Sequence, residues 1–364
     1  MNQKLEQVLQ SCCYSEDKLV HFSFYEMDEC SIKVQSNIKK AVSYIDETFK
    51  YYKSNELNSD NFFSINIIHI GDAPLSPFNS LMVNQKQSDG ITNFDWESGK
   101  GVSWDNEAIA FIDLEQTNNV TVIISNFDKA PSTSSVNRGP LTMKKGNFEY
   151  DWEIVADLIK GIYAHSSNSL CLHAACIEKN GKGVLICGDS GSGKTTTSTM
   201  LINDGYNFLC DDISFIKNND GLTVSGMLMS PRYVGKSPEN ISEIEATISN
   251  SQTESMPKIN FELPDDIIST SRKTKATPEL ILLIKKPENR IQDHSVTKIS
   301  ETDAFIKLMQ QIIDPFSIFR RSHHMDIVHS LINSADVYEF IPGYDIKSIH
   351  SFINNLLKEH LLAE

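Results

Sequence analysis

The sequence contains no run of 18 apolar residues, and this absence excludes a membrane-spanning helix. Its densest apolar stretches, residues 61–70 and 279–284, have the length of strands. The amino terminus also lacks the basic segment followed by an apolar one that is typical of a secretory signal. We therefore expect a cytoplasmic protein with no membrane partner.

Positive charge is scarce in this chain. There are 33 Lys and Arg residues against 48 Asp and Glu residues, which gives a formal net charge of −15 that is spread over both halves. Such a chain lacks the general basic surface that binds DNA, RNA or an anionic membrane. No nucleic-acid partner is expected, and any bound phosphate must be held by local groups.

The cysteines include no CxxC pair. Four of the seven, Cys171, Cys176, Cys187 and Cys210, lie on apolar segments that have the pattern of strands. Cysteines in such surroundings are usually small buried hydrophobic residues. We expect this role for them, in preference to a metal site or a redox site.

With 364 residues, the chain has room for two domains. A polar stretch at 129–140 marks the expected boundary. We expect a smaller α+β amino-terminal domain over residues 1–140, with a role in acceptor binding or assembly. The second domain is expected over residues 150–364, and the fold class is α/β with a mixed α+β sheet.

Periodicity places several elements along the chain. Apolar residues at helical spacing predict a helix over 36–53, and short strand-like pieces over 91–127 predict an antiparallel meander. The second domain begins with a predicted helix over 151–166. Its polar, serine-rich segment 235–277 is either a lid over a substrate or a plain surface loop.

The sequence GDSGSGKT at residues 188–195 matches the phosphate-binding pattern G-x-x-x-x-G-K-[ST] in full. An apolar strand precedes it and a helical segment follows. The glycines let consecutive backbone N–H groups turn inward around phosphate oxygens, and the start of the helix adds partial positive charge. Lys194 is expected to reach the β- and γ-phosphates, and the Thr195 hydroxyl to ligate Mg²⁺. The residues expected to bind the nucleotide are Gly188, Asp189, Ser190, Gly191, Ser192, Gly193, Lys194, Thr195 and Thr196, and the expected cofactors are ATP and Mg²⁺.

The strand that leads into this loop is expected to pair antiparallel with the strand before it. Asn180-Gly181 is a strong two-residue hairpin signal, and it sets Lys179 opposite Lys182. The same register places His173 opposite Gly188, at the mouth of the loop. His173 is therefore either a core histidine or a group within reach of the nucleotide phosphates.

Asp211 and Asp212 interrupt an apolar strand that follows the loop helix. Buried carboxylates are costly unless they meet a cation or take part in proton transfer. Successive strand residues point to opposite faces, so a strand end or a bulge is needed to bring both into one site. One carboxylate would then hold Mg²⁺ while the other accepts the proton of an attacking hydroxyl. The alternative is a turn or a helix cap.

Together these motifs resemble the HPr kinase family, bacterial serine kinases whose P-loop domain is related to phosphoenolpyruvate carboxykinase. The resemblance is carried by His173, the loop 188–195, Asp204-Gly205 and the pair Asp211-Asp212. It implies a kinase fold of this type for the second domain, and it leaves a homo-oligomer open because members of the family commonly assemble.

The resemblance also implies roles for single residues. Asp211 is then the base for the substrate hydroxyl, and Asp212 holds Mg²⁺ together with Thr195. Lys194 contacts the phosphates and His173 supports the γ-phosphate region. The two aspartates could exchange roles.

The chain departs from the family in two places. Segment 221–236 lacks the signature rich in Arg-Gly that carries a metal-assisting Glu, and residues 1–150 show no resemblance. Both departures favour HPr-kinase-like enzymes that phosphorylate a peptide hydroxyl, such as those acting on the C-terminal serine of lasso-peptide precursors.

We therefore expect an ATP-dependent phosphotransferase that acts on a serine-type hydroxyl of a peptide or protein. One alternative is a small-molecule kinase on the same scaffold. Another is a nucleotide-binding regulatory module with weak hydrolysis, which would need only one of the two carboxylates.

Overall fold

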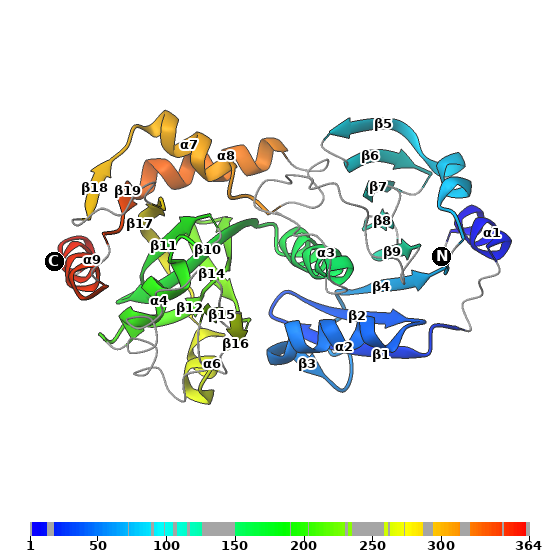
Figure 1. Ribbon diagram of the computed structural model, residues 1–364, viewed down its shortest axis with the longest axis horizontal. Coiled ribbons are helices and arrows are strands. Elements are labelled where there is room, and N and C mark those ends of the chain that lie inside the picture. Colours follow the sequence, from blue (N-terminus) through cyan, green and yellow to red (C-terminus); the bar gives the residue numbers. More distant parts are fainter. Residues whose placement is uncertain are drawn as a thin grey trace. The chain divides into compact units, whose positions relative to one another are not determined.

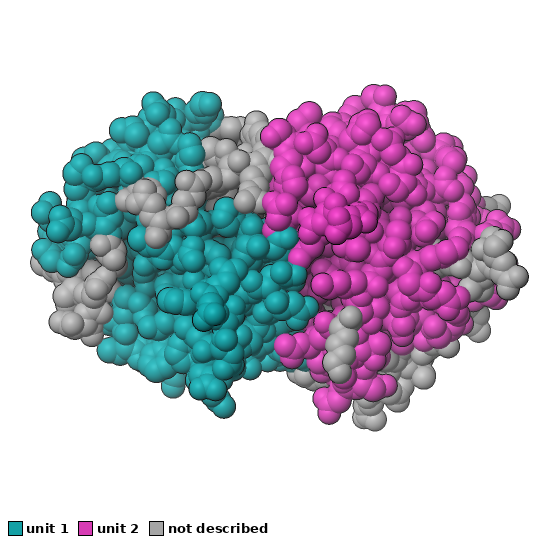
Figure 2. Space-filling model, turned by 180° about the vertical axis from the view of Figure 1, so that it is seen from behind, with its two compact units in different colours: residues 1–167, 314–319 teal, residues 168–313, 320–364 magenta. Residues whose placement is uncertain are grey.

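The chain folds into two compact units of mixed α/β structure, which are coloured separately in Figure 2. Unit 1 comprises residues 1–167 and 314–319, and unit 2 comprises residues 168–313 and 320–364. The computed structural model describes residues 2–12, 18–71, 73–88, 91–97, 99–104, 108–114, 117–125, 150–189, 191–202, 204–229, 232–234, 258–260, 263–272, 274–286, 294–313, 321–343 and 346–361. The expected linker at 129–140 and most of the expected lid, 235–257, lie outside these residues.

Within its described residues, unit 1 contains one nine-stranded sheet, ordered β3-β1-β2-β4-β9-β8-β7-β6-β5. The strands are β1 (His21–Met27), β2 (Cys30–Ser36), β3 (Lys53–Ser54), β4 (Phe62–His69), β5 (Val83–Ser88), β6 (Ile91–Trp96), β7 (Gly99–Trp104), β8 (Ala108–Asp113) and β9 (Asn119–Ile124). Strands β6 to β9 form the antiparallel meander predicted over 91–127, and β5 extends it by one strand. By contrast β2, β4 and β9 pair in parallel, an arrangement that the sequence did not predict.

Helices cover this sheet. They are α1 (Gln3–Ser11), α2 (Lys39–Thr48) and α3 (Tyr150–Ser166), with short 3-10 helices η2 (Lys50–Tyr52) and η3 (Ser76–Leu81). Leu5 and Leu9 of α1 pack into a buried cluster with Phe78 and Phe111. Helix α2 packs on β1 and β2, where the Tyr25 hydroxyl donates a hydrogen bond to an Asp46 carboxylate oxygen at 2.8 Å. Unit 1 includes α3, which the expected domain ranges assigned to the second domain.

Unit 2 contains an eight-stranded mixed sheet ordered β14-β13-β10-β11-β17-β19-β18, in which β12 also pairs with β10. Its strands are β10 (Leu170–Lys179), β11 (Lys182–Gly188), β12 (Asn207–Cys210), β13 (Ile213–Asn218), β14 (Leu222–Met227), β17 (Thr277–Ile284), β18 (Ser295–Lys298) and β19 (Asp336–Ile341). A separate ribbon pairs β15 (Arg232–Val234) with β16 (Lys258–Asn260). The helices of this unit are α4 (Lys194–Ile202), α6 (Asp265–Ser271), α7 (Glu301–Met309), α8 (Arg321–Ser334) and α9 (Ile346–Leu361) (Figure 1).

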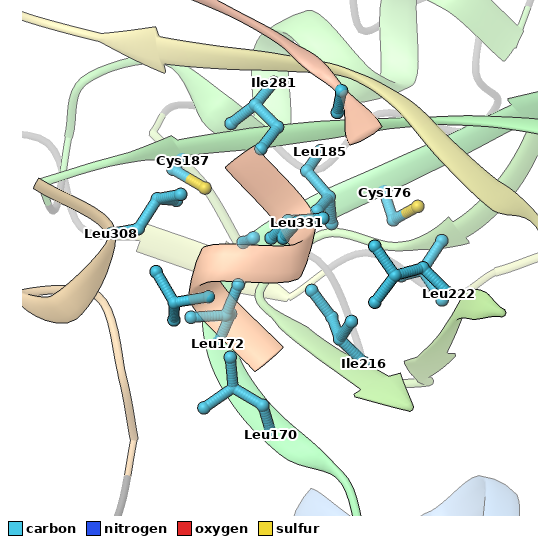
Figure 3. Close-up of a cluster of buried hydrophobic side chains, with 14 of the residues drawn as sticks. Leu170, Leu172, Cys176, Leu185, Cys187, Ile216, Leu222, Ile281, Leu308 and Leu331 are labelled. Atoms are coloured by element: carbon cyan, nitrogen blue, oxygen red, sulfur yellow. The ribbon is translucent and has the colours of Figure 1, made fainter. Parts of the chain in front are cut away.

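The central strands of unit 2 are buried on both faces. In β11, Leu185 and Cys187 belong to a core cluster with residues of α7 and α8, as Figure 3 shows for Leu308 and Leu331. Val184 and Ile186, which alternate with them, belong to a second cluster with residues of α4 and α9. The sheet therefore lies between two helical layers, which explains why its strands are continuous apolar runs.

The cysteines on these strands are buried, as predicted. Cys171, Cys176, Cys187 and Cys210 are each at most 2% exposed. Burial raises the pKa of the Cys187 and Cys210 thiols to about 12. They are packing residues that stay protonated at neutral pH. In the part of the chain that the structure describes, no helix is long and apolar enough to cross a membrane.

Candidate active site

The hairpin that delivers the phosphate-binding loop has the predicted register. Lys179 pairs with Lys182, and the pairing continues to Ala174 opposite Cys187. Asn180 and Gly181 form the turn with φ values of 56° and 81°, as a type I′ turn requires. The strand β11 then ends at Gly188, the first residue of the motif.

The loop needs glycine at Gly188 because of close packing and at Gly193 because of its backbone conformation. A Cβ added at Gly188 would lie 2.4 Å from the Ile284 carbonyl oxygen and 2.7 Å from Ser192 Oγ, so only glycine fits there. Gly193 has a φ of 108°, which lets the chain turn directly into α4. The structure places the predicted loop residues together at the start of this helix, except Ser190, which lies outside the described residues.

Lys194 is the first residue of α4, and only 6% of its surface is exposed. Its Nζ donates hydrogen bonds to the Gly188 carbonyl oxygen at 2.7 Å and the Asp189 carbonyl oxygen at 3.4 Å. The ammonium group therefore lies at the loop itself. Ser192 Oγ of the same loop is buried and has no hydrogen-bond partner in the part of the chain that the structure describes.

The two aspartates lie at a break between strands, as the sequence analysis required for both to reach one site. β12 pairs with Cys176–Glu178 of β10, whereas β13 pairs with Leu170–His173 of the same strand. Asp211 and Asp212 occupy the bend between them. Strand β10 therefore fixes both carboxylates.

Each aspartate has a different partner. The Thr195 hydroxyl donates to Asp211 Oδ2 at 3.2 Å, and Asp211 is 6% exposed. His173 Nε2 lies 2.8 Å from Asp212 Oδ1, and the Asp212 side chain is 40% exposed. Asp211 thus lies beside the threonine that was expected to ligate Mg²⁺, and Asp212 lies beside the histidine, as exchanged roles of the two aspartates would require.

One residue at the site has no sequence signal. The segment after α7 runs beside the start of β10, where the His173 amide donates to the Gln311 carbonyl oxygen at 2.8 Å. Gln311 lies far from the motifs in sequence and belongs to no recognisable pattern. Only the tertiary structure brings it to His173.

Comparison with known proteins points to one family. Residues 164–233 match the family model described as the HPr Serine kinase C-terminal domain. The HPr kinase/phosphorylase of Clostridium beijerinckii is 35% identical over 68 residues, which are 19% of this chain and 19% of that protein. The enzyme of the same name from Clostridium botulinum (strain Eklund 17B / Type B) is 38% identical over 53 residues, which are 15% of this chain and 17% of the relative. The chain thus spans about a fifth of the length of the curated relatives it matches.

A solved structure, that of the Hpr(Ser) kinase/phosphatase from Coxiella burnetii, aligns over 53% of this chain and 96% of its own, at 18% identity and a TM-score of 0.27. The family-model match covers the segment that carries the hairpin, the phosphate-binding loop and both aspartates. Residues 164–233 of this chain are thus similar to the C-terminal domain of HPr kinases.

Proposed function

We propose that this protein is a Mg²⁺- and ATP-dependent kinase that transfers the γ-phosphoryl group to a serine-type hydroxyl of a peptide or protein. The observation that carries the proposal is the pairing of Thr195 with Asp211 and of His173 with Asp212 beside the phosphate-binding loop. One pair offers oxygen ligands for a cation, and the other offers a carboxylate to receive a proton. Phosphoryl transfer to a hydroxyl needs both.

The loop fits a nucleotide triphosphate. The first turn of α4 leaves backbone N–H groups at its start, and Lys194 adds a full positive charge at the same place. Ser192 Oγ is buried and has no hydrogen-bond partner among the described residues, so a phosphate oxygen would satisfy it. Although the chain has a net charge of −15, these groups make the phosphate-binding loop locally positive.

The donor set also fits Mg²⁺. This ion prefers oxygen ligands, and it commonly binds through one or two protein groups together with substrate phosphates and water. Thr195 Oγ1 and Asp211 Oδ2 are 3.2 Å apart and supply such a pair. Within the described residues no three His, Cys, Asp or Glu side chains form a metal-binding group. We therefore propose a site in which the nucleotide phosphates complete the ligands of Mg²⁺. Bound Mg²⁺ would neutralise charge on the phosphates.

Asp212 is the base in this proposal. His173 Nε2 donates to its Oδ1 and orients the carboxylate, while the 40% exposure of Asp212 leaves it accessible to an incoming hydroxyl. Asp211 is buried and engaged with Thr195, and is therefore the poorer candidate. Proton acceptance by Asp212 makes the hydroxyl oxygen a better nucleophile as it attacks the γ-phosphorus.

The acceptor is proposed from the comparisons. The matched relatives are named HPr kinase/phosphorylase, and the matches cover at most 19% of this chain. We propose a different acceptor, a peptide such as a ribosomally made precursor, and assign its recognition to the amino-terminal domain. Dependence on ATP would place the reaction in the cytoplasm. Self-association of the chain is a further part of this proposal, which light scattering during size-exclusion chromatography tests.

The experiment is an incubation of the protein with Mg²⁺-ATP and a panel of serine-containing peptides, proteins and small alcohols, followed by mass spectrometry. A phosphate adduct on a peptide serine supports the proposal. An adduct only on a small alcohol would refute the peptide acceptor, and ADP release without any adduct would refute the kinase. The variant Asp212→Asn is a second test, which should abolish most of the transfer. Its control is Asp220→Asn, which changes an exposed carboxylate of the same unit.

A further inference from the structure

Three buried side-chain polar atoms lack a hydrogen-bond partner in the part of the chain that the structure describes. They are Ser192 Oγ, His173 Nδ1 and Gln311 Oε1. Ser192 belongs to the phosphate-binding loop, and His173 contacts Asp212. Buried polar atoms are rarely left unpaired, and such exceptions indicate a functional role when they gather at one site.

Gln311 is tied to His173 through the backbone. The His173 amide donates to the Gln311 carbonyl oxygen at 2.8 Å, and the Ile313 amide donates to the Cys171 carbonyl oxygen at 2.9 Å. Leu172 and Ile312 form an antiparallel bridge between these two bonds. Gln311 is therefore held in register beside His173, and 8% of its surface is exposed.

The groups that carry two of these atoms, the His173 imidazole and the Gln311 side-chain amide, have complementary chemistry. Asp212 accepts a hydrogen bond from His173 Nε2, which leaves Nδ1 as an acceptor in the neutral ring or as a donor in the protonated ring. A side-chain amide suits both states, because its NH₂ group donates and its oxygen accepts. The direction of a glutamine amide follows from the hydrogen bonds it makes. Apart from Ser192 Oγ in the phosphate-binding loop, no other buried side-chain N or O atom of the described residues lacks a partner.

His173 and Gln311 lie opposite each other in this antiparallel pairing, so their side chains share one face. We infer that Gln311 is the positioning residue of His173, with its side-chain amide bonding Nδ1 after a rotamer adjustment or through one water molecule. This contact fixes the rotation of the imidazole ring and keeps Nε2 directed at Asp212. Its importance for catalysis rests on the proposed function, whereas the contact itself does not. Gln311 touches neither nucleotide nor acceptor in this scheme.

The test replaces Gln311 with methionine, which keeps the length of the side chain and removes its polar atoms. Gln310→Met is the matched control, because Gln310 is the exposed neighbour in sequence. The first measurement is the long-range ¹H–¹⁵N spectrum of histidine-labelled protein, in which the His173 ring is assigned with His173→Gln. The second is the rate of ADP release from Mg²⁺-ATP with water as the acceptor.

We expect Gln311→Met to shift the His173 Nδ1 resonance and to lower kcat about 10-fold or more at a nearly unchanged KM for ATP, while Gln310→Met does neither. An unmoved Nδ1 resonance would overturn the inference, whatever the rate. A moved resonance with unchanged kcat would overturn the positioning role.

Two further cases must be covered, a variant that does not fold and a wild-type protein that is inactive. Should Gln311→Met fail to fold, Gln311→Asn withdraws the amide by one methylene, and the same two measurements apply. A wild-type protein that transfers no phosphoryl group to any acceptor of the panel would refute the proposed function alone, because the Nδ1 resonance still decides whether Gln311 binds His173.

Discussion

Replacing Asp212 with asparagine should abolish most of the phosphoryl transfer while leaving the fold and nucleotide binding intact. Asparagine keeps the size of the side chain and can still accept the hydrogen bond that His173 Nε2 donates over 2.8 Å. It cannot accept the proton of the attacking hydroxyl. The variant therefore removes proton acceptance by residue 212 while keeping the size and shape of its side chain.

The size of the effect follows from the chemistry and from exposure. A positioned general base contributes roughly 10²- to 10⁴-fold in rate, which corresponds to about 2.7–5.5 kcal/mol in activation free energy. Because the Asp212 side chain is 40% exposed, its substitution should change the free energy of unfolding by no more than about 0.5 kcal/mol.

Asp211→Asn should behave differently. The amide oxygen can still accept from the Thr195 hydroxyl, but the site loses its negative charge toward Mg²⁺. We expect the Mg²⁺ concentration for half-maximal activity to rise roughly 10-fold, or about 1.4 kcal/mol of binding free energy. High Mg²⁺ should then restore much of the rate, which it cannot do for Asp212→Asn.

The assay is a Mg²⁺ titration of ADP release at saturating ATP, with binding of a fluorescent ATP analogue measured in parallel. Asp220→Asn is the control for a simple change of net charge. An Asp212→Asn protein within threefold of the wild-type rate would refute the role of this residue as base. Rescue of Asp212→Asn but not of Asp211→Asn by Mg²⁺ would show that the two roles are reversed.

Three other predictions concern binding and stability. Lys194→Ala should weaken ATP binding about 10- to 100-fold, measured by calorimetry, because a charge-assisted contact to phosphate is lost; unaltered affinity would mean that the loop is not the nucleotide site. Asp204→Ala removes the acceptor for His350 Nε2 at 2.6 Å and for the Asn354 amide at 3.0 Å, and should lower the free energy of unfolding by about 1–3 kcal/mol without changing ADP release. Burial raises the pKa of the Cys187 thiol from 9.0 to about 12, so the unfolded state loses this proton first. The contribution of this thiol to the free energy of unfolding is therefore complete below pH 9 and falls by about 1.4 kcal/mol per pH unit above it. In denaturant melts at pH 8 and pH 10, wild type should lose this much more stability with rising pH than Cys187→Ala does.

Local rules were enough to predict the framework of the candidate site. The Asn180-Gly181 turn fixes the register of its hairpin, and the glycine pattern at 188–195 fixes the loop between a strand and a helix. The same holds for the meander of unit 1, in which neighbouring strands are joined by short turns. In each case the residues that determine the structure are adjacent in sequence.

The sequence could not predict contacts that depend on distant segments. The parallel pairing of β2, β4 and β9 joins strands separated by helices or by other strands, and no turn residue records it. The alternation of side chains along a strand predicts a break at Asp211 if both carboxylates are to reach one site. The partner of each carboxylate, however, depends on where β10 places His173 and where α4 places Thr195. Gln311 is the extreme case, since its only relation to the site is spatial.

Strand β10 pairs with other strands on both of its edges, so we expect the candidate site to be lost only when unit 2 unfolds. It carries His173, its hairpin partner leads into the phosphate-binding loop, and its other neighbours hold both aspartates. Because local opening requires a region with few buried hydrogen bonds, the groups of the site cannot be released one at a time. In native-state hydrogen exchange, the amides of β10 should therefore exchange only through opening of the whole unit, and activity should disappear in the same step as the fold when denaturant is added.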